Sequence, residues 1–427
     1  MVNRPPDDER VEVLLTGATG FLGKVVLAEL LKRLPTARIW ALVRPSESQT
    51  ARERYIRQVR LSPAFEDLPR GTWRRVRPLR GDVAKPDLGI SPGMTRLLRE
   101  RLTHVVHCAA SVDFDLPLRD AAVSNISGSL HCLALARSCE RPPVMVSVST
   151  AYVGPHPPCG PLREELVPLP LDPQATYDAI LAGDADQAEL LTASRHPNTY
   201  TFTKCLAEHL LVAQRGDVPL QIVRPSIISA SHSDPVPGWI DSYAAFAGFV
   251  VLIGAGRLRA LRAVPETPLD IVPCDAVATR IVDCALEPPS SGDVGIHYAV
   301  VGVDRAPTVQ ECCDRIVEYF TLSPIDRKPG MSYVGSDPVR FELEHLQHHV
   351  APRTLATAWL GLLGKDRSRR GVKRLFERVS YLNEAFPYFT HNTFDFQPKQ
   401  PLELPGHDPG DYITEVCSGV TQYLMGR

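Results

Sequence analysis

Tyr200 and Lys204 are the two residues whose types and spacing most directly suggest chemistry. Four positions separate them, so in a helix both side chains lie on one face. A phenol has an ordinary pKa of about 10, which makes it a weak acid at neutral pH, but a nearby ammonium stabilises the phenolate and lowers that pKa. Tyr200 would then donate a proton to a carbonyl oxygen during its reduction. The same pair also occurs on solvated helix faces, so the surrounding elements must decide its meaning.

A glycine turn near the N-terminus predicts a second binding element. A short apolar strand over 11–15 precedes Thr16-Gly-Ala-Thr-Gly-Phe-Leu-Gly23, and an amphipathic helix over 24–34 follows. Glycines at this spacing permit a tight turn, close approach of a pyrophosphate and helix packing, while the helix N-terminus faces the negative charge. We expect the turn to bind a dinucleotide through Thr16, Gly17, Thr19, Gly20, Phe21, Leu22 and Gly23.

The end of the second strand, over 39–43, indicates which dinucleotide is bound. Arg44 stands where an NAD-selective protein usually has an acidic residue for the ribose hydroxyls. Arg54 would complete a clamp for a 2′-phosphate, since guanidinium binds phosphate in a bidentate fork. NADPH is therefore the expected cofactor. In the alternative interpretation Arg44 ends the strand and Arg54 lies on a solvated helix face.

Four further apolar strands, over 76–79, 104–108, 144–148 and 220–223, each end in small or polar residues. Strands alternate with helices from residue 11 to about 228, which predicts an α/β fold with a Rossmann-type, doubly wound parallel sheet. Ligands bind at the carboxyl ends of such strands, so these tips should line one crevice. We assign Asp82 and Val83 to the adenine, Ala109, Ala110 and Ser111 to the adenosine and ribose, and Pro225, Ser226 and Ile227 to the nicotinamide side.

Composition excludes several classes of partner. A net charge of -2 over 427 residues argues against nucleic acid as a partner. The ten cysteines lack metal-site spacing, which indicates a reducing compartment, and His345, His348 and His349 lack further ligands, so no metal site is predicted. The N-terminus has no apolar signal core, and the longest apolar run, over 244–256, is shorter than the roughly 20 residues that span a bilayer. We expect a cytoplasmic protein without a transmembrane segment.

Several segments together resemble the fatty acyl-CoA reductase family of the male-sterility type, within the extended short-chain dehydrogenases/reductases. The most specific are Ser149-Thr-Ala-Tyr-Val153, Pro197-Asn-Thr-Tyr-Thr-Phe-Thr-Lys204, and Val223-Arg-Pro-Ser-Ile227 followed by Pro237-Gly-Trp-Ile-Asp241. The resemblance is close from residue 11 to about 275. Beyond that it is looser: residues 411–413 and 419–424 resemble the C-terminal end of the family, whereas the region around Phe394 keeps part of the pattern.

The resemblance implies catalytic roles for Thr150, Tyr200 and Lys204. Tyr200 would polarise the substrate carbonyl, Lys204 would hold the nicotinamide ribose, and Thr150, with Ser149 as the fallback, would share the oxyanion. The implied reaction is NADPH-dependent reduction of a fatty acyl-CoA thioester to the aldehyde and onward to the primary alcohol, although the family includes members that release either product. Asn125 is interpreted either as a helix cap or as support for a proton-relay water.

These observations divide the chain into three parts: a disordered N-terminus over 1–10, an NADPH-binding domain over 11–275, and a smaller, mostly helical substrate domain over 276–427 with helices over 308–320 and 353–363. We interpret 155–198 as an insertion over the crevice, with a passive surface loop as the alternative. Residues 231–262 suit either an acyl-chain pocket or a core helix. The basic stretch 365–374 would meet CoA phosphates, an acidic carrier protein or anionic lipid, or is a solvated helix face.

Two rival functions remain at this point. One is a different enzyme, such as a thioester reductase acting on a carrier-protein-bound intermediate, or a dehydrogenase acting on a sugar nucleotide or alcohol. The other is a dinucleotide-binding protein without turnover. The complete set of Thr150, Tyr200 and Lys204 argues against the second, because a binding protein needs no proton donor. The oligomeric state is not predicted.

Overall fold

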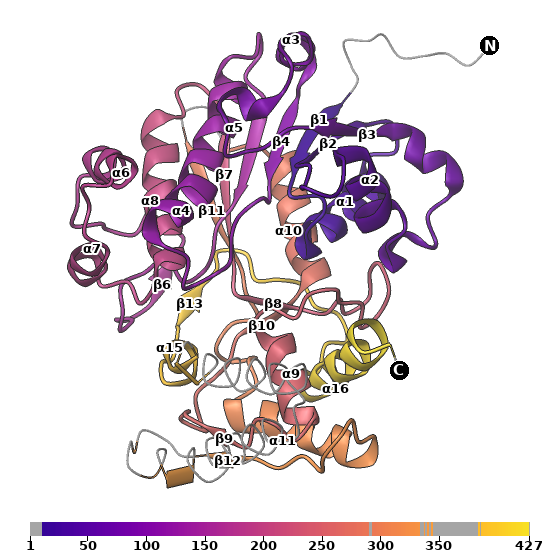
Figure 1. Cartoon of the computed structure of the whole chain (residues 1–427), viewed down its shortest axis with the longest axis vertical. Helices are drawn as coiled ribbons and strands as arrows, with labels where there is room; N and C mark the ends of the chain where they lie inside the picture. Colours follow the sequence, from indigo (N-terminus) through magenta and orange to yellow (C-terminus); the bar gives the residue numbers. More distant parts are fainter. Residues whose placement is uncertain are drawn as a thin grey trace, which may run out of the picture.

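The computed structural model describes residues 11–289, 293–333 and 386–426, together with 337, 340, 343, 344, 383 and 384. Within this part of the chain, seven parallel strands form one sheet in the order β11-β7-β5-β4-β1-β2-β3 (Figure 1). The strand order reverses between β1 and β4, which confirms the predicted doubly wound topology. The strands are β1 (Glu12–Thr16), β2 (Arg38–Val43), β3 (Val76–Arg80), β4 (His104–His107), β5 (Val144–Val148), β7 (Leu220–Pro225) and β11 (Val294–Ala299).

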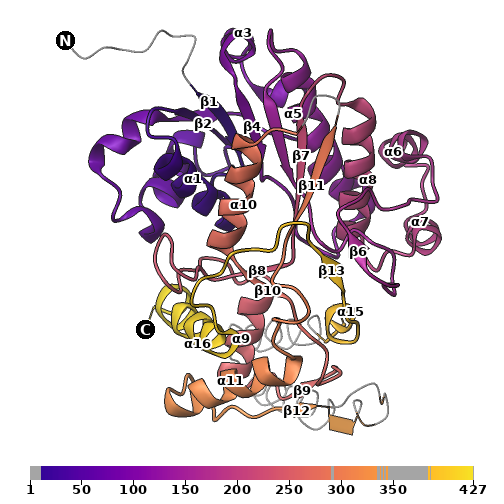
Figure 2. The same ribbon diagram turned by 180° about the vertical axis from the view of Figure 1, so that it is seen from behind.

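Helices cover both faces of this sheet because its strands are apolar on both sides. Val13 and Leu15 of β1 face a core shared with α1 (Phe21–Arg33) and α10 (Cys274–Leu286). Leu14 faces the opposite core, which includes side chains of α3 (Pro92–Arg101), α5 (Gly128–Arg137) and α8 (Thr199–Gln214). Figure 1 shows α5 and α8 in front of the strands, and Figure 2 shows α10 across the reverse face.

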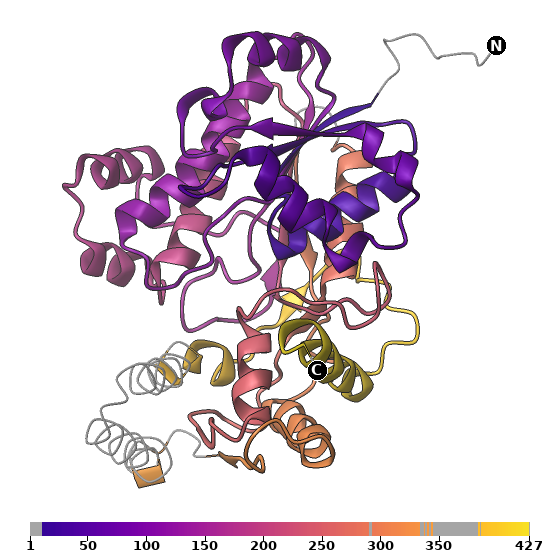
Figure 3. The same ribbon diagram turned by 45° about the vertical axis from the view of Figure 1, so that its right-hand side comes forward.

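A smaller half lies beyond the carboxyl ends of the strands, where Figure 3 shows red, orange and yellow elements below the indigo and magenta ones, while the salmon-coloured α10 stays with the sheet. Most of its described helix and strand residues are helical, and its core is built around α9, which is buried along almost its whole length. Residues 231–262 therefore include a core helix, one of the two alternatives. The helices are α9 (Phe246–Gly254), α11 (Val309–Leu322), α15 (Pro387–Thr390) and α16 (Pro409–Gly419), and the strand pairs are β8 (Ile227–Ser229) with β10 (Ile271–Pro273), β9 (Ala260–Leu261) with β12 (Ser332–Tyr333), and β6 (Leu162–Arg163) with β13 (Phe396–Gln397).

The fold does not change from one half to the other at residue 275. Strand β11 pairs with β7 along its whole length, and α10 packs against α1 on the large sheet. Both elements belong to the cofactor half in space, although they follow or straddle residue 275. A division by role, with substrate binding assigned to 276–427, stays a prediction.

The helices of the insertion over 155–198 pack against other helices, and its position over the crevice stays a prediction. Its helices α6 (Pro173–Ala182) and α7 (Gln187–Ser194) pack against α8, and α6 also meets α4 (Leu118–Ala122). Tyr177 and Ile180 bury their side chains in a cluster with Phe202 and Leu206 of α8. The apolar face of this helix pair therefore fixes it to the outer flank of α8, while His156 and Pro157, from the start of the insertion, line a pocket described below.

Shorter helical turns connect these elements. They are α2 (Ala51–Tyr55), the 3₁₀ turns η3 (Pro63–Phe65), η4 (Arg70–Arg75) and η5 (Pro86–Gly89), and the π-helical turns η2 (Ile56–Arg60), η6 (Val123–Ser127) and η8 (Val420–Leu424). Among the described residues, none of the helices has both the length and the apolar character needed to cross a bilayer. The same residues contain no group of three or more His, Cys, Asp or Glu arranged to hold a metal ion. The N-terminus over 1–10, the expected helix over 353–363, the three histidines at 345, 348 and 349 and the basic stretch 365–374 lie outside the described residues.

Candidate active site

The glycine turn has the geometry that close approach of a pyrophosphate requires. Gly17 has a φ of +74°, and a Cβ on it would lie 2.7 Å from the backbone nitrogen of Ala109. A Cβ on Gly23 would lie 2.1 Å from the Gly17 carbonyl oxygen, so helix and turn pack without room for a side chain. Gly20, the N-cap of α1, provides no side-chain cap, which leaves the first N–H groups of the helix to a ligand. The turn therefore fits a dinucleotide phosphate.

Thr16 links the glycine turn to the end of β4. Its hydroxyl accepts the Ala109 N–H at 3.2 Å, which leaves its proton for Nδ1 of His107 at 2.8 Å. Burial lowers the pKa of His107 to about 3, so the ring is neutral and Nδ1 can accept. His107 was not among the predicted residues, since a histidine inside an apolar strand carries no signal of its partner. The contact aligns the turn with the loop of Ala109 and Ala110.

Arg44 and Arg54 meet at the carboxyl end of β2. The Arg54 guanidinium donates to the Arg44 carbonyl oxygen, and to Oε1 of Gln58 at 3.2 Å. The capping box of Thr50 and Glu53 starts α2 at the point that brings Arg54 back to the strand end. Arg44 itself is exposed. The Arg54 guanidinium thus lies against the backbone of Arg44.

Asp82 and Val83 follow β3 in a turn. The Asp82 carboxylate accepts the N–H of Ala84 at 3.1 Å, which holds the side chain in an Asx turn. The Val83 carbonyl oxygen lies 2.7 Å from Nδ1 of His131 on α5, and the Val83 side chain packs against Gly128. These contacts fix the strand end where the adenine was predicted to bind.

Asn125 links the loop that follows β4 to α8. Its Oδ1 accepts the N–H of Ser111 at 2.8 Å, and its Nδ2 donates to the Thr203 hydroxyl at 3.1 Å. Asn125 lies inside the π-helical turn η6, which continues α4 into α5, so the interpretation as a helix cap is wrong. Single π-turns within helices often mark functional sites. Asn125 instead positions the loop predicted to bind the ribose against the helix that carries Tyr200.

Thr150 and Tyr200 form the reactive pair. The Thr150 hydroxyl interacts with the phenol, and Asn198 caps the first turn of α8, which holds Tyr200. Burial raises the pKa of Tyr200 to about 12, and the interaction with Thr150 works in the opposite direction. This differs from the lowering that we expected from Lys204: desolvation of the phenolate dominates the shift, and Lys204 is not among the groups that cause it. The Phe114 ring lies 5.7 Å from the Tyr200 ring, between centroids, and closes one side of the phenol.

Lys204 lies one turn further along α8 and is buried. Its ammonium donates to the Val148 carbonyl oxygen at 2.8 Å, at the end of β5. Burial lowers its pKa to about 8, and the Glu208 carboxylate opposes that shift. Glu208 in turn holds the Arg224 guanidinium in a bidentate pair, with N···O distances of 3.0 and 2.6 Å. Lys204, Glu208 and Arg224 thus form a buried row of charges between α8 and β7.

Ser226 differs from its neighbours in the predicted nicotinamide segment, because its side chain has a protein partner. Its hydroxyl donates to Asp270 at 2.5 Å, and the same carboxylate accepts the N–H groups of Val301 and Gly302. The Pro225 carbonyl oxygen accepts the Ala151 N–H at 2.8 Å. The segment is therefore anchored to the strand that carries Thr150.

A pocket of about 460 Å³ is lined in part by Phe114, whose ring contacts that of Tyr200, and by Asn198, the N-cap of α8; Tyr200 itself is not part of the lining. Aromatic rings surround this region: the Tyr152 ring centroid lies 4.8 Å from that of Phe389 and 4.9 Å from that of Phe394. Sequence reasoning missed these contacts, since Tyr152 and Phe389 are far apart in the chain. The lining combines apolar rings with a few polar groups, as small-molecule sites do, and includes Phe114, His156, Asn198, Arg262, Tyr388 and Asn392.

The pKa of Lys204 predicts how cofactor binding depends on pH. Affinity should fall as the pH rises through about 8, because Lys204 then loses the positive charge assigned to the cofactor ribose, whereas Tyr200 keeps its proton up to about pH 12. The measurement is a fluorescence titration of the cofactor at several pH values. Burial also lowers the pKa of Lys24 to about 8, so Lys24→Arg, whose guanidinium does not titrate in this range, is the control. Constant affinity between about pH 7 and pH 9 would contradict the assignment.

Comparison with known proteins identifies the family. Residues 15–281 match the family described as "Male sterility protein". The chain belongs to this family. Its curated relatives include fatty acyl-CoA reductase 1 of Gallus gallus, which is 30% identical over 100% of this chain and 87% of its own length. Fatty acyl-CoA reductase 2 of Mus musculus is 28% identical over 97% of this chain and 84% of its own length.

Solved structures share the fold of this male sterility family member. The terminal R domain from the myxalamid PKS-NRPS biosynthetic pathway superposes with a TM-score of 0.69 at 22% identity, covering 97% of this chain and 91% of that one. The reductase domain of a nonribosomal peptide synthetase from Mycobacterium tuberculosis gives a TM-score of 0.62 at 20% identity, covering 99% and 94%. The protein is an oxidoreductase with a nicotinamide dinucleotide cofactor, as the resemblance of the sequence implied.

Proposed function

We propose that the protein reduces a fatty acyl-CoA thioester with NADPH, first to the aldehyde and then to the primary alcohol. The observation that carries this proposal is the pairing of the Thr150 hydroxyl with the Tyr200 phenol beside Lys204, at the strand ends next to the glycine turn. Two hydroxyl donors at one point suit a carbonyl oxygen that gains negative charge. The cysteine spacing supports a reducing compartment, so we assign the activity to the cytoplasm.

The reaction requires the residues to stabilise charge and to deliver a proton. When bound, NADPH supplies the hydride for the carbonyl carbon. The Thr150 and Tyr200 hydroxyls donate to the oxygen as its charge develops. With a pKa of about 12, Tyr200 is protonated at neutral pH and can complete the transfer once an aldehyde occupies the site. Expulsion of the thiolate from the first adduct leaves that aldehyde against the same two donors, and a second NADPH, bound after the oxidised cofactor leaves, would supply the hydride for the second reduction.

The two arginines at the end of β2 support NADPH over NADH. Arg44→Ala should weaken NADPH binding by about 1.5 to 3 kcal/mol, because it removes a charge-assisted contact with the 2′-phosphate, and should leave NADH binding unchanged. Arg52→Ala is the matched control, since Arg52 is also exposed and lies on α2. Calorimetric titration of both cofactors measures the effect. Equal binding of NADPH and NADH by the native protein would contradict this choice of cofactor.

The pocket lined by Phe114 and Asn198 supports an acyl substrate. Its aromatic surroundings suit an alkyl chain, and its polar lining, including Arg262 and His156, suits the amide and phosphate groups of a CoA arm. The names of the curated relatives also point to acyl-CoA. Carrier-bound thioesters are the alternative, because one solved structure with this fold is a thiolation-reductase di-domain from an archaeal non-ribosomal peptide synthetase.

Incubation with NADPH and matched acyl-CoA and acyl-carrier-protein thioesters tests the proposal, with cofactor oxidation and product identity as readouts. We expect acyl-CoA to be consumed and alcohol to accumulate. Turnover with carrier-bound thioesters alone would replace the proposed substrate, and aldehyde as the sole product would remove the second step. Absence of cofactor oxidation with every thioester would overturn the proposed function.

A further inference from the structure

Pro237-Gly-Trp-Ile-Asp241, here called the joint, connects the two halves of the molecule. Trp239 and Ile240 are adjacent in sequence, yet their side chains enter different cores. Trp239, 1% exposed, packs with α1 and α10 of the cofactor half, whereas Ile240, 2% exposed, packs with α9, α11 and α16 of the smaller half. Because each side chain is buried on its own side, the joint ties the halves together at this point.

Lys24 fixes the joint to the first turn of α1. Its ammonium forms an ion pair with the Asp241 carboxylate and lies 5.7 Å from the centroid of the Trp239 ring. The Phe21 ring, also in the first turn, lies 5.4 Å from Trp239. A buried cation near a helix N-terminus is unfavourable, and burial lowers the pKa of Lys24 to about 8. Asp241 supplies the opposite charge that this position requires.

The joint also packs against α16 of the smaller half, and this contact leaves no room for side chains at the two glycines that form it. Gly238 has a φ of +72°, and a Cβ on Gly419 of α16 would lie 1.7 Å from the Gly238 carbonyl oxygen. On the same side, Nδ1 of His232 lies 3.1 Å from the Glu415 carboxylate. A displacement of the joint must therefore displace α16 or break this contact.

We propose that Lys24 and Asp241 are positioning residues, which align the substrate half with the turn that receives the cofactor phosphates. This inference rests on the proposed function. The first turn of α1 carries both the N–H groups that face the pyrophosphate and the lysine that holds the joint. The first turn of α1 would therefore position both the cofactor and, through the joint, the half that is predicted to bind the substrate. Hydride transfer needs reacting atoms within a few tenths of an ångström of their best separation, and a misplacement of about 1 Å can cost about 100-fold in rate.

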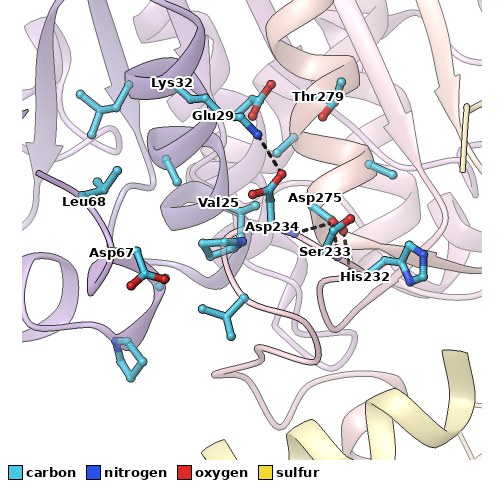
Figure 4. A pocket seen from close by; sticks show the side chains of 18 of the residues that line it. Val25, Glu29, Lys32, Asp67, Leu68, His232, Ser233, Asp234, Asp275 and Thr279 are labelled. Carbon is cyan, nitrogen blue, oxygen red and sulfur yellow. Dashed lines mark hydrogen bonds and ion pairs between the residues drawn. The ribbon is translucent and has the colours of Figure 1, made fainter. Parts of the chain in front are cut away.

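A second ion pair, between α1 and the loop just before the joint, provides a matched control. Lys32 of α1 and Asp234 form an ion pair at 2.9 Å, beside a cavity of about 480 Å³ on the outside of α1 (Figure 4). Its side chains are 60% and 59% exposed, so solvent screens the pair and its loss should change little. It shares the helix and the loop region with Lys24 and Asp241, whose side chains are only 6% and 28% exposed.

The kinetic test compares Lys24→Met, Asp241→Asn and the double variant with Lys32→Met and Asp234→Asn. We expect each buried-pair variant to lower kcat for acyl-CoA reduction by about 10- to 100-fold, with NADPH affinity within about twofold of native. The double variant should lose no more than the single variants, because the two residues act as one unit. Lys24→Arg, which keeps the charge, should recover most of the rate. Additive losses, or equal losses in the control pair, would overturn the proposal.

A measurement that does not require turnover tests the positioning role independently of the proposed function. Hydrogen exchange of the backbone over 415–419 should slow when NADPH binds the native protein and should not respond in Asp241→Asn. Urea unfolding of each variant checks that a rate loss does not simply follow lost stability. A native protein without thioester turnover would refute the proposed function while leaving the exchange test intact. The positioning role would be refuted if NADPH left the exchange rate over 415–419 unchanged in the native protein, or if NADPH slowed that exchange equally in Asp241→Asn.

Discussion

Replacement of Tyr200 by phenylalanine is expected to lower the rate of hydride transfer by about 10² to 10⁴, while NADPH binding stays nearly unchanged. The ring keeps its packing against Phe114, but the hydroxyl that Thr150 contacts is lost. Neither thioester nor aldehyde would then receive a proton or a second hydrogen bond at oxygen. Single-turnover measurement of cofactor oxidation gives the rate directly, without a contribution from product release.

Lys204→Ala is the informative companion variant, because it should weaken cofactor binding as well as turnover. Its ammonium donates to the Val148 carbonyl oxygen and is assigned to the nicotinamide ribose. The two variants therefore separate proton donation from cofactor binding. Near-native single-turnover rates in Tyr200→Phe would exclude the proposed mechanism, even though the fold would be unaffected.

Replacement of Glu208 by glutamine is expected to lower the free energy of unfolding by about 3 to 5 kcal/mol. Arg224 is 0% exposed and keeps its charge, so the change leaves a buried guanidinium without its anionic partner. Glu208 also supports the charge of Lys204, so the pKa of Lys204 should fall further below about 8 in this variant. Stability and the pH dependence of cofactor binding should therefore change together.

Urea unfolding and the pH titration of cofactor affinity test this pair of effects. Asp283→Asn is the control for stability, because it breaks the largely exposed pair with Arg33 at 3.0 Å and should cost less than about 1 kcal/mol. Equal losses in Glu208→Gln and Asp283→Asn would show that the buried row of charges contributes no more than a surface pair.

Local sequence patterns predicted the elements of the cofactor half well. The apolar run over 144–148 is strand β5 as expected, and Tyr200 and Lys204 lie on one helix because Asn198 caps it and no proline interrupts it. These features depend on neighbouring residues, so the sequence displays them directly. The family and the Rossmann-type sheet followed from the same motifs. The catalytic and cofactor assignments of single residues stay predictions, for which the experiments above are designed.

Contacts between distant residues were not predictable. Nothing in the sequence around Lys24 indicates Asp241, which lies 217 positions away, and Asn125 gives no sign that it binds Ser111 and Thr203. The raised pKa of Tyr200 depends on burial, which spacing along a helix does not report. The outer position of α6 had a weak signal, since Tyr177 and Ile180 lie on one helix face, but the partner of that face was unknown.

Strand β11 follows residue 275 in the chain, yet it belongs to the sheet of the cofactor half, so that half cannot be isolated by cutting the chain at residue 275. All six residues of β7 are buried, and β11 covers one of its edges. A fragment that ended at residue 275 would leave that edge unpaired, as an open template for strands of other copies and hence for aggregation. It would also lose most of α10, which covers the apolar face formed by Val146 and Val223. The shortest fragment that closes the sheet on this side runs to Ala299, and during synthesis the cofactor half must wait for that strand before it can complete its fold.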